Sequence, residues 1–444
     1  MSTVEEVKIL SKTFKGGIHP DYNKERTFAR AIERLPASDK VIIPLRQHIG
    51  AACEPLVRKG DYVKLGQPIG ESDASISCPV HASVSGTVKA VEPRWNQNGT
   101  RELSVVIEND FEDRRFEECF PREKEMKRLS SEDIVEGARR YGIVGMGGAG
   151  FPLHAKLRAA IDSKVDTLII NGAECEPYVT CDHRAMIEYP RYIVGGILLI
   201  MRCLGLDGAI LAIEKNKPDA INSMKITSED TGITVAELET KYPQGGEKQL
   251  VYALTGREIP PGKLPTDIGC AVFNVDTCAS LFRGFDTGLP LYQRVVTVSG
   301  DAVKKPKNLL TRIGTPYETL FEYCGGFEKE PYKIICGGPM MGLAQHSLEI
   351  PVVKNTSALL AFAEGNETIE ENPICIRCGK CSRVCPMRLM PNYIFLYGSR
   401  GDLRECEKLN ATDCIECGCC SYICPGKMHL VQAIRMVKGK LSRR

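Results

Sequence analysis

The chain has 444 residues, too many for one hydrophobic core, so we expect about two to four domains. Lys and Arg number 58 and Asp and Glu 56, and this near balance excludes a nucleic-acid binder that acts mainly by neutralising phosphates. The longest apolar run, residues 192–201, is about half as long as a membrane-spanning helix and is expected in the core.

The 20 cysteines are interpreted through the expected location of the protein. The first residues, MSTVEEVKIL, lack the basic and apolar regions of a signal peptide, so we expect a cytoplasmic protein. In that reducing compartment cysteines serve as metal ligands or buried small side chains, not as a disulfide framework.

Residues 41–92 consist of short β-branched runs separated by Gly, Pro, Asp and Ser, a pattern typical of a small all-β barrel or sandwich. The halves KGDYVKLGQPIG and CPVHASVSGTVKAV resemble the two halves of a barrel-sandwich hybrid of the biotinyl and lipoyl type. Such carriers hold a lysine at an exposed hairpin tip, but the expected tip here, ESDASIS, has none. We therefore predict that the N-terminal region, residues 1–120, contains a barrel-sandwich hybrid without carrier chemistry.

Residues 121–290 are predicted to form an α/β domain. A capping signal at Ser130 and Asp133 begins a helical pattern, which turns glycine-rich before the buried strand VDTLIING at 165–172. Helical and strand-like runs then alternate to about residue 290. Residues 295–345 indicate strand, turn, strand, short helix and strand. We predict a β-grasp, SLBB-like module over residues 291–350 and a linker over residues 351–370.

Residues 371–444 carry the run CIRCGKCSRVCP at 375–386 and a second run, CIECGCCSYICP, at 414–425. Each has the spacing C-x2-C-x2-C-x3-C-P of two-cluster ferredoxins, in which the fourth cysteine ligates the other cluster. The tail is therefore predicted to be a helical, ferredoxin-like domain with two [4Fe–4S] clusters. The predicted ligands are Cys375, Cys378, Cys381 and Cys424 for one cluster, and Cys414, Cys417, Cys420 and Cys385 for the second.

Two alternatives concern this tail. Zinc also takes four thiolates, but zinc sites pair two C-x2-C knuckles across a longer spacer and have no use for a third evenly spaced cysteine. Within the second run, Cys419 is an alternative to Cys420 as third ligand, and the regular spacing favours Cys420. Cys406 is expected to be an ordinary buried thiol.

The segment GMGGAGFPLHAKL, residues 145–157, matches G-x-G-x-x-G at Gly145, Gly147 and Gly150. A Rossmann site requires a full strand directly before the loop, whereas here a capped helix is expected to end a few residues earlier, at Tyr141. By itself the match is as compatible with a simple turn as with a ligand site. Glycines allow backbone amides to approach a phosphate or a flat ring, and Lys156 is placed to meet an anion.

A second polar patch, NGAECEPY at 171–178, places Asn171, Glu174 and Glu176 just after the buried strand, where open α/β sheets bind ligands. The two carboxylates are either part of a solvated turn or hydrogen-bond acceptors for a ring or a ribose. The later segments YPQGGEKQL at 242–250 and KLPTDIGCAVFNVDT at 263–277 add further polar groups among glycines and prolines.

These four patches, in this order, resemble the flavin-binding subunit of respiratory complex I, which binds FMN and NADH with such segments. The resemblance implies FMN contacts from Gly145, Gly147, Gly148, Lys156, Asn171 and Asn274. It implies that Phe151, Glu176 and Glu247 lie near the nicotinamide dinucleotide, and the matching segments add Gly150, Glu174, Tyr242 and Thr266 as cofactor-binding candidates. Ala173 stands where that family has an aspartate and Gly246 where it has a glutamate, which puts nucleotide affinity in question.

From end to end, the chain resembles the family of C subunits of Rnf electron-transport complexes. The resemblance is carried by the opening TFKGGIHPDYNK, the segment IPLRQHIGA, the barrel-sandwich hybrid, GMGGAGFPLHAKL, NGAECEPYVTCDHR, YPQGGEKQLVYALTGREIPPGKLP, the β-grasp module and the paired cysteine runs. Members of this family are peripheral, lie on the cytoplasmic face of the membrane and belong to an ion-translocating complex. The resemblance implies an NAD-linked flavin and iron–sulfur oxidoreductase component that holds FMN, NAD(H) and two [4Fe–4S] clusters. Its implied partners are the membrane subunits and, indirectly, ferredoxin.

Two rival functions are compatible with parts of the sequence. A flavin and iron–sulfur cobalamin reductase of microcompartments shares the flavin and cluster modules, but the segments TFKGGIHP and IPLRQHIGA favour the Rnf family. An electron-transfer adaptor with a non-functional NADH site is supported only by Ala173 and Gly246.

No side chain is expected to act as a general acid or base, because the redox chemistry belongs to the cofactors. We therefore predict no catalytic residue. The remaining histidines and cysteines that attract attention are expected to pack in the core or lie at the surface: His48, His81, His154, His183, Cys53, Cys78, Cys175 and Cys181.

Overall fold

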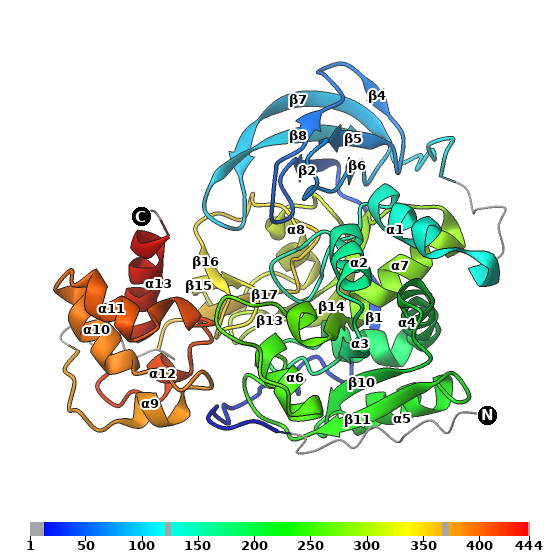
Figure 1. Ribbon diagram of the computed structural model, residues 1–444. Helices are drawn as coiled ribbons and strands as arrows, with labels where there is room; N and C mark the ends of the chain where they lie inside the picture. The colour runs from blue at the N-terminus through cyan, green and yellow to red at the C-terminus, as the bar shows by residue number, and fades with distance from the viewer. Residues whose placement is uncertain (1–12, 120–125, 366–372, 443–444) are drawn as a thin grey trace, which may run out of the picture.

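The structure, a computed structural model, describes residues 13–119, 126–365 and 373–442 (Figure 1). A β-rich unit lies at the top of the view, an α/β domain and a second sheet form the centre, and the cysteine-rich tail forms a helical lobe on the left. Within these described ranges no helix is both long enough and apolar enough to span a bilayer.

Two antiparallel sheets form the N-terminal barrel-sandwich hybrid, as its short β-branched runs predict. The first sheet contains, in spatial order, β2 (Lys40–Pro44), β8 (Arg101–Asn109), β7 (Gly86–Trp95) and β4 (Tyr62–Val63). The second contains β3 (Glu54–Pro55), β5 (Pro68–Glu71) and β6 (Val80–His81). Alternate side chains of β2 and β8, such as Val41, Ile43, Val105 and Ile107, are fully buried, so the two sheets close on one apolar core.

The α/β domain is built on four parallel strands. They are β9 (Thr167–Asn171), β10 (Ala209–Glu214), β11 (Ile233–Leu238) and β12 (Cys270–Asn274), in the spatial order β11-β10-β9-β12. The chain therefore starts in the middle of the sheet, moves outward to β11 and returns to the other side of β9. This reversal of direction between β9 and β12 is the switch point at which doubly wound sheets bind ligands.

Helices cover both faces of this sheet, which is why its strands are continuous apolar runs. The helices are α1 (Ser131–Arg140), α2 (Leu153–Asp162), α3 (Cys181–Glu188), α4 (Pro190–Leu204), α5 (Pro218–Thr227), α6 (Glu247–Thr255) and α7 (Val275–Thr287), with 3-10 turns η1 (Met126–Arg128) and η2 (Pro265–Ile268). On one face α1, α2, α4, α5 and α7 pack against residues such as Leu168 and Leu211. On the other face α6 packs against Ile169 and Ile210.

The start of α1 confirms the predicted capping signal. The Ser130 hydroxyl oxygen accepts a hydrogen bond from the Asp133 backbone N–H at 3.2 Å, and the Asp133 carboxylate accepts one from the Ser130 backbone N–H at 3.0 Å. This reciprocal pair satisfies two of the N–H groups that a helix leaves without partners at its start. The helix ends at Arg140 with Tyr141 as its cap, so no strand precedes the glycine-rich loop.

The second sheet has six strands, in the order β1-β14-β13-β17-β15-β16. Four elements follow the predicted strand, turn, strand, helix, strand pattern, namely β13 (Gln293–Ser299), β14 (Lys307–Arg312), α8 (Tyr317–Tyr323) and β15 (Pro331–Cys336). The strand β16 (Leu343–Gln345) was not part of that pattern and pairs with β15. The N-terminal region adds β1 (Ile32–Arg34), which pairs with β14. The N-terminal region therefore extends beyond the barrel and is built into this sheet.

The expectation of a linker over residues 351–370 was wrong for part of that stretch. Residues Ala358–Ala363 form β17, which lies inside the sheet and pairs with both β13 and β15. The run ALLAFA is almost entirely buried, because each edge of the strand has a partner and both faces are covered. Its partners are distant in sequence, so the local pattern gave no sign of them.

The C-terminal lobe is helical, as expected. It contains α9 (Lys380–Val384), α10 (Pro391–Ser399), α11 (Leu403–Lys408), α12 (Cys419–Tyr422) and α13 (Leu430–Leu441), with a 3-10 turn η3 (Ala411–Asp413). A small core that includes Ile394, Cys406, Ile434 and Val437 holds the longer helices together. Cys406 is fully buried in this core, which confirms its prediction as a packing thiol.

An extended N-terminal segment, residues 13–20, joins the α/β domain to this lobe. The Gly17 N–H donates to the Val384 carbonyl at 2.8 Å, and Ile18 exchanges two backbone hydrogen bonds of 2.9 Å with Tyr242. Gly16 has φ +80°, and a Cβ there would lie 2.8 Å from the Cys385 carbonyl oxygen. The two glycines of the opening motif TFKGGIHP thus allow its backbone to contact the backbone of the first cysteine run directly.

Candidate functional site

Two asparagines mark the switch point of the parallel sheet. Asn171 ends β9 and Asn274 ends β12, and the two residues are register partners in neighbouring strands. The Asn171 side chain donates to the Gly245 carbonyl at 2.9 Å, and the Asn274 side-chain oxygen accepts the Asp276 N–H at 2.9 Å at the start of α7. Parallel strands end at the same edge, so both predicted residues lie at the edge where such sheets bind ligands.

The glycine-rich loop, residues 145–150, covers this edge. The Met146 N–H donates to the Thr277 hydroxyl at 2.9 Å, which ties the loop to α7. A Cβ at Gly147 would lie 2.8 Å from the Asn274 side-chain nitrogen, so only glycine fits there without displacing Asn274. The loop is therefore more than a turn, because its backbone forms one wall of the switch point.

A cavity of about 570 Å³ opens between this loop, the ends of β9 and β12, and the start of α6. We call it the switch-point cavity. All but one of the predicted cofactor-binding residues line it, namely Gly145, Gly147, Gly148, Gly150, Phe151, Lys156, Asn171, Glu174, Glu176, Tyr242, Glu247 and Asn274.

Thr266 is the exception, since it does not line this cavity. It lies in η2, directly before β12 begins at Cys270, whereas the cavity lies where β12 ends at Asn274. A strand separates the two ends, so Thr266 belongs to the opposite edge of the sheet.

Lys156 and Glu247 form an ion pair of 3.0 Å at the cavity. Both side chains are partly exposed, at 30% and 41%, so the pair contributes little to stability. The Lys156 ammonium also lies 5.5 Å from the centre of the Phe273 ring. A weak, accessible pair of this kind leaves the cation available to an anionic ligand.

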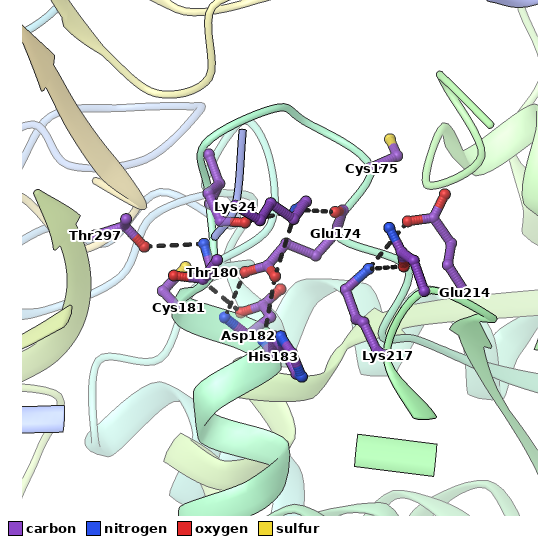
Figure 2. A network of polar contacts seen from close by, with 12 residues as sticks. Lys24, Glu174, Cys175, Thr180, Cys181, Asp182, His183, Glu214, Lys217 and Thr297 are labelled. Atoms are coloured by element: carbon purple, nitrogen blue, oxygen red, sulfur yellow. Dashed lines mark hydrogen bonds and ion pairs between the residues drawn. The ribbon is translucent and has the colours of Figure 1, made fainter. Parts of the chain in front are cut away.

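Glu174 lines the cavity, but its carboxylate is engaged in the protein (Figure 2). It accepts hydrogen bonds from the Asp182 N–H at 2.6 Å and the His183 N–H at 3.3 Å, at the start of α3. The Lys24 ammonium lies 3.8 Å away and donates to the Glu174 backbone carbonyl at 2.8 Å. Glu174 therefore serves as a cap for α3 and as an anchor for the N-terminal segment.

Asp182 is a cavity residue that sequence analysis missed as a candidate. Its carboxylate accepts a hydrogen bond of 2.7 Å from the Asn274 side chain. Burial, followed by the nearby Glu174 and Asp276, raises the pKa of Asp182 to about 7. The segment YVTCDHR was visible in the sequence, but nothing local indicated that its aspartate reaches the end of β12.

Glu176 connects the cavity to the second sheet. Its carboxylate accepts hydrogen bonds from the backbone N–H groups of Met340 and Met341, both at 3.0 Å, and from the Tyr242 hydroxyl at 3.3 Å. A Cβ at Gly338 would lie 2.2 Å from this carboxylate, so glycine permits the β15–β16 loop to approach. Burial raises the pKa of Glu176 to about 7.

Tyr242 stands between the cavity and the C-terminal lobe. It is fully buried, and its hydroxyl donates to the Cys417 carbonyl at 2.8 Å. Its ring packs in one cluster with Cys175, Cys417 and Cys419. Ile415, which lies between two predicted cluster ligands, itself lines the switch-point cavity. The cavity therefore adjoins the second cysteine run directly.

The eight predicted cluster ligands separate into two small pockets, and each pocket collects the cysteines that the spacing assigns to one cluster. Cys375, Cys378, Cys381 and Cys424 line one pocket, and we call them the outer cysteine set. Cys385, Cys414, Cys417 and Cys420 line the other, and we call them the inner cysteine set. Each pocket thus takes three cysteines from one run and one from the other.

Cys419 also lines the inner pocket, so both candidates for the third ligand are near it. The Cys419 thiol lies 3.9 Å from the Tyr242 carbonyl oxygen, which accepts a weak hydrogen bond from it. The thiols of Cys417 and Cys385 lie near both candidates, and Cys414 adds to the neighbours of Cys420. The preference for Cys420 therefore rests on the regular spacing of the run.

The two departures from the complex I pattern have local explanations. Ala173 is fully buried, and its carbonyl accepts a hydrogen bond of 2.6 Å from the buried Lys217 ammonium. A Cβ at Gly246 would lie 2.6 Å from the side-chain oxygen of Gln249, which is buried and lines the cavity. In this chain Gln249 therefore occupies space beside position 246 that a larger residue there would need.

The other cysteines and histidines singled out in the sequence are buried or partly buried. Cys53, Cys78, Cys175 and Cys181 are all buried, and Cys175 and Cys181 also line the switch-point cavity. The His48 ring contacts the backbone of Ile49 and Cys78, and His183 pairs with Asp219 at 2.7 Å. His81 and His154 are held in surroundings whose burial lowers their pKa to about 3 and about 4.

Comparison with known proteins gives three matching domain families. The RnfC barrel sandwich hybrid domain matches residues 12–112, the Nuo51 FMN-binding domain residues 138–283 and the SLBB domain residues 295–344. These matches follow the architecture described above in the same order along the chain.

Curated relatives match almost the whole chain. The C subunit of the proton-translocating ferredoxin:NAD(+) oxidoreductase complex of Clostridium ljungdahlii is 47% identical over 432 residues, which cover 97% of this chain and 94% of that protein. The C subunit of the Na(+)-translocating ferredoxin:NAD(+) oxidoreductase complex of Acetobacterium woodii is 47% identical over 430 residues, 97% of each chain. The C subunit of an ion-translocating oxidoreductase complex of Vibrio cholerae is 38% identical over 93% of this chain but only 54% of its own length.

Among solved structures, an NAD+-reducing [NiFe]-hydrogenase in the H2-reduced state superimposes with a TM-score of 0.51. The match covers 72% of this chain and 64% of that chain at 18% sequence identity. At this identity the likeness shows a shared fold alone.

Proposed function

The chain belongs to the family of C subunits of ion-translocating Rnf oxidoreductase complexes, and on this premise we propose that it exchanges electrons between NAD(H), FMN and two [4Fe–4S] clusters within such a complex. The observation that carries the proposal is the position of the switch-point cavity, whose wall includes Tyr242 and Ile415 beside the inner cysteine set.

The cavity residues fit a flat, phosphorylated cofactor. The cavity volume, about 570 Å³, is in the range of cofactor sites. Gly147 leaves a backbone surface beside Asn274 that a side chain would fill. Among the described residues the buried side-chain oxygen of Gln249 has no hydrogen-bond partner, so the cavity wall offers an acceptor for a bound molecule.

FMN would be held by the glycine-rich loop together with Lys156, Asn171 and Asn274. When bound, FMN takes up an electron pair from NADH and releases the electrons singly. Lys156 would offer its cation to an anionic group once it leaves Glu247, because their ion pair is exposed and weak. Phe151 and Glu247 line the same cavity and would contact the nicotinamide dinucleotide. Glu176 would shape the wall, since its carboxylate is occupied by Met340 and Met341.

The inner and outer cysteine sets would each hold one [4Fe–4S] cluster. Four thiols line each pocket, and soft thiolate donors in this spacing suit iron–sulfur clusters. Clusters of this kind carry one electron at a time.

The surroundings of the two sets indicate the order in which electrons would pass them. The inner set lies against the cavity, where Cys417 and Cys420 are buried. In the outer set Cys375 and Cys378 are exposed. Electrons that enter at the cavity would therefore pass the inner set first and leave the protein at the outer set, or follow the reverse route.

The same order supports a position for the partners. The outer set would face the membrane subunits, through which the chain communicates with ferredoxin, and the protein would be peripheral on the cytoplasmic face of the membrane.

An anaerobic stopped-flow experiment tests this function. The purified chain is reconstituted with iron, sulfide and FMN and then mixed with NADH. We expect bleaching of the flavin absorbance, followed by electron paramagnetic resonance signals from reduced [4Fe–4S] clusters. If dithionite reduces two clusters while NADH leaves flavin and clusters oxidised, the chain is an adaptor or a reductase of another kind and the proposal fails.

A matched pair of variants makes the test specific. Lys156→Met removes the cation at the cavity and is expected to weaken FMN binding by about tenfold. Lys225→Met removes an exposed lysine of α5, which pairs with Glu237 away from the cavity, and should leave FMN affinity unchanged. Equal losses in both variants would contradict the assignment of the cavity.

A further inference from the structure

The loop of the outer cysteine set is unusually exposed and apolar. Ile374 and Ile376 flank Cys375, and at 70% and 66% they are the two most exposed large hydrophobic side chains of the described residues. Cys375 and Cys378 are the only exposed cysteines of the 20 in the chain. An exposed apolar patch that contains predicted redox ligands is a feature of a contact surface and not of a free one.

Four cations surround this patch. Arg377 and Lys380 line the outer pocket, and Arg383 follows Lys380 by one turn of α9. Lys427 follows Gly426, where a Cβ would lie 2.1 Å from the Ile374 carbonyl oxygen, so it lies beside the same loop. All four side chains are exposed, and none of them has a salt bridge or side-chain hydrogen bond to another described residue.

Among the described residues the patch carries no compensating negative charge of its own. Residues 373–384 and 421–430, which supply the outer set, contain no Asp or Glu, whereas the preceding Glu370 and Glu371 lie outside the described residues. By contrast, beside the inner set Glu416 pairs with both Arg435 and Lys438, at 2.8 Å and 2.6 Å. The cations at the outer set are therefore available to a partner.

From these observations we propose that the face formed by Ile374, Ile376, Arg377, Lys380, Arg383 and Lys427 is the docking surface for an acidic iron–sulfur protein or domain. The inference deepens the proposed function, on which it rests for the cluster at the outer set. Apolar side chains at the centre and charges at the rim are the composition of specific transient interfaces.

A redox partner explains the patch better than a lipid surface does. Electron transfer requires the two centres to lie close, and exposed Cys375 and Cys378 bring the outer cluster to the molecular surface. Lipid covering the same loop would leave that cluster without an acceptor. The basic rim selects an acidic partner, because attraction between unlike charges accelerates and orients docking.

Binding of an acidic 2[4Fe–4S] ferredoxin, used as a soluble probe with the chemistry of the proposed partner, is the test. The oxidised ferredoxin is immobilised, and its affinity for the full chain, reconstituted with iron, sulfide and FMN, is measured by biolayer interferometry. We expect the variant Lys380→Glu, Arg383→Glu, Lys427→Glu to weaken binding by at least about tenfold. Raising NaCl from about 50 mM to about 300 mM should weaken binding of the unaltered chain but have little effect on this variant.

Two further variants keep the test decisive. The control Lys59→Glu, Lys304→Glu, Lys305→Glu reverses three exposed cations elsewhere and should bind within about twofold of the unaltered chain. Ile374→Ser with Ile376→Ser should weaken binding about fivefold or more while keeping its salt dependence. Iron and sulfide content is measured for every variant, and if the charge reversal loses the outer cluster, the isoleucine variant decides.

Three outcomes overturn the proposal. The charge-reversed variant keeps its affinity, or the control loses as much affinity as the variant does. In the third outcome, vesicles of phosphatidylcholine with phosphatidylserine bind the unaltered chain but not the charge-reversed variant, while the unaltered chain and the variant bind ferredoxin equally. That result would assign the face to lipid. The binding experiment needs neither NADH nor flavin reduction, so failure of the NADH experiment above and failure of this one are separate results.

Discussion

The two cysteine runs share one skeleton, yet the protein surrounds them differently. The inner set is packed against Tyr242, Cys175 and the β15–β16 loop, whereas the outer set opens to solvent at Cys375 and Cys378. The outer loop is basic, and its cations form no ion pair within the described part of the chain, while the one acidic residue within the second run, Glu416, pairs with two cations. A sequence repeat therefore gives the same set of thiols at two places, and the tertiary structure packs one set beside the cavity and exposes the other.

The largest expected difference between the two sets follows from replacing one predicted ligand in each. We expect Cys417→Ser to remove the inner cluster, so NADH still bleaches the flavin but no longer reduces the outer cluster. Cys378→Ser should remove the outer cluster and leave reduction of the inner one intact. Iron analysis and electron paramagnetic resonance after mixing with NADH distinguish the two variants. If NADH reduces the remaining cluster equally well in both, the order of the sets is wrong.

Two glycines at equivalent positions of the two runs give a second test of the difference between the sets. Gly379 and Gly418 follow the second cysteine of each run and have φ +68° and +82°, so alanine costs about 1–2 kcal/mol of backbone strain at either. At Gly418 a Cβ would also lie 2.9 Å from the Met340 carbonyl oxygen, whereas at Gly379 it would meet nothing within 4 Å. Gly418→Ala should therefore lose about 1–3 kcal/mol more than Gly379→Ala. Thermal unfolding of the reconstituted proteins measures this difference, and equal losses would show that the inner loop is not packed against Met340.

Tyr242 is the direct link between cavity and inner set. Tyr242→Phe removes the hydrogen bonds to the Cys417 carbonyl and Glu176, at an expected cost of about 1–3 kcal/mol. It should also slow the step from flavin bleaching to reduction of the inner cluster. Tyr317→Phe is the matched control, because this buried hydroxyl donates to the Cys336 thiol at 3.3 Å in the second sheet. The control should lower the melting temperature without changing that step, and a similar slowing in both variants would count against the link.

The smallest expected effect is a pH dependence at Glu176. Burial raises its pKa from 4.5 to about 7, so between these values the folded protein holds a proton that the unfolded chain releases. The free energy of unfolding then falls as pH rises through this window, by at most about 1.4 kcal/mol per pH unit for this group. Glu176→Gln has no proton to lose and should show a shallower fall in melting temperature from about pH 5 to about pH 7.5. Parallel curves for the two proteins would contradict the raised pKa.

Local patterns predicted much of the fold and most of the cavity. The α1 cap, the barrel-sandwich hybrid and the alternating α/β order depend on neighbouring residues, and the structure confirms them. The structure also brings Lys156, Asn171 and Asn274 to one cavity. Thr266 does not line this cavity, and proximity to β12 in sequence does not tell which end of the strand a residue joins.

Residues that depend on long-range packing escaped prediction. Asp182 and Gln249 face the cavity only because α3 and α6 pack at the ends of different strands. β17 and β1 complete a sheet whose other strands lie elsewhere in the sequence, so neither showed its partners locally. Met340 and Met341 reach Glu176 across 164 and 165 residues of chain.

The sequence by itself determined which cysteines belong together, because ligand spacing is a local property that the chain keeps wherever the lobe is placed. Only the tertiary structure decided which set is inner and which is outer. Burial depends on side chains that pack from distant segments, here Tyr242 and Met340 against Cys417 and Gly418. Where no described residue covers the run, as at Ile374 and Ile376, the same spacing lies at the surface.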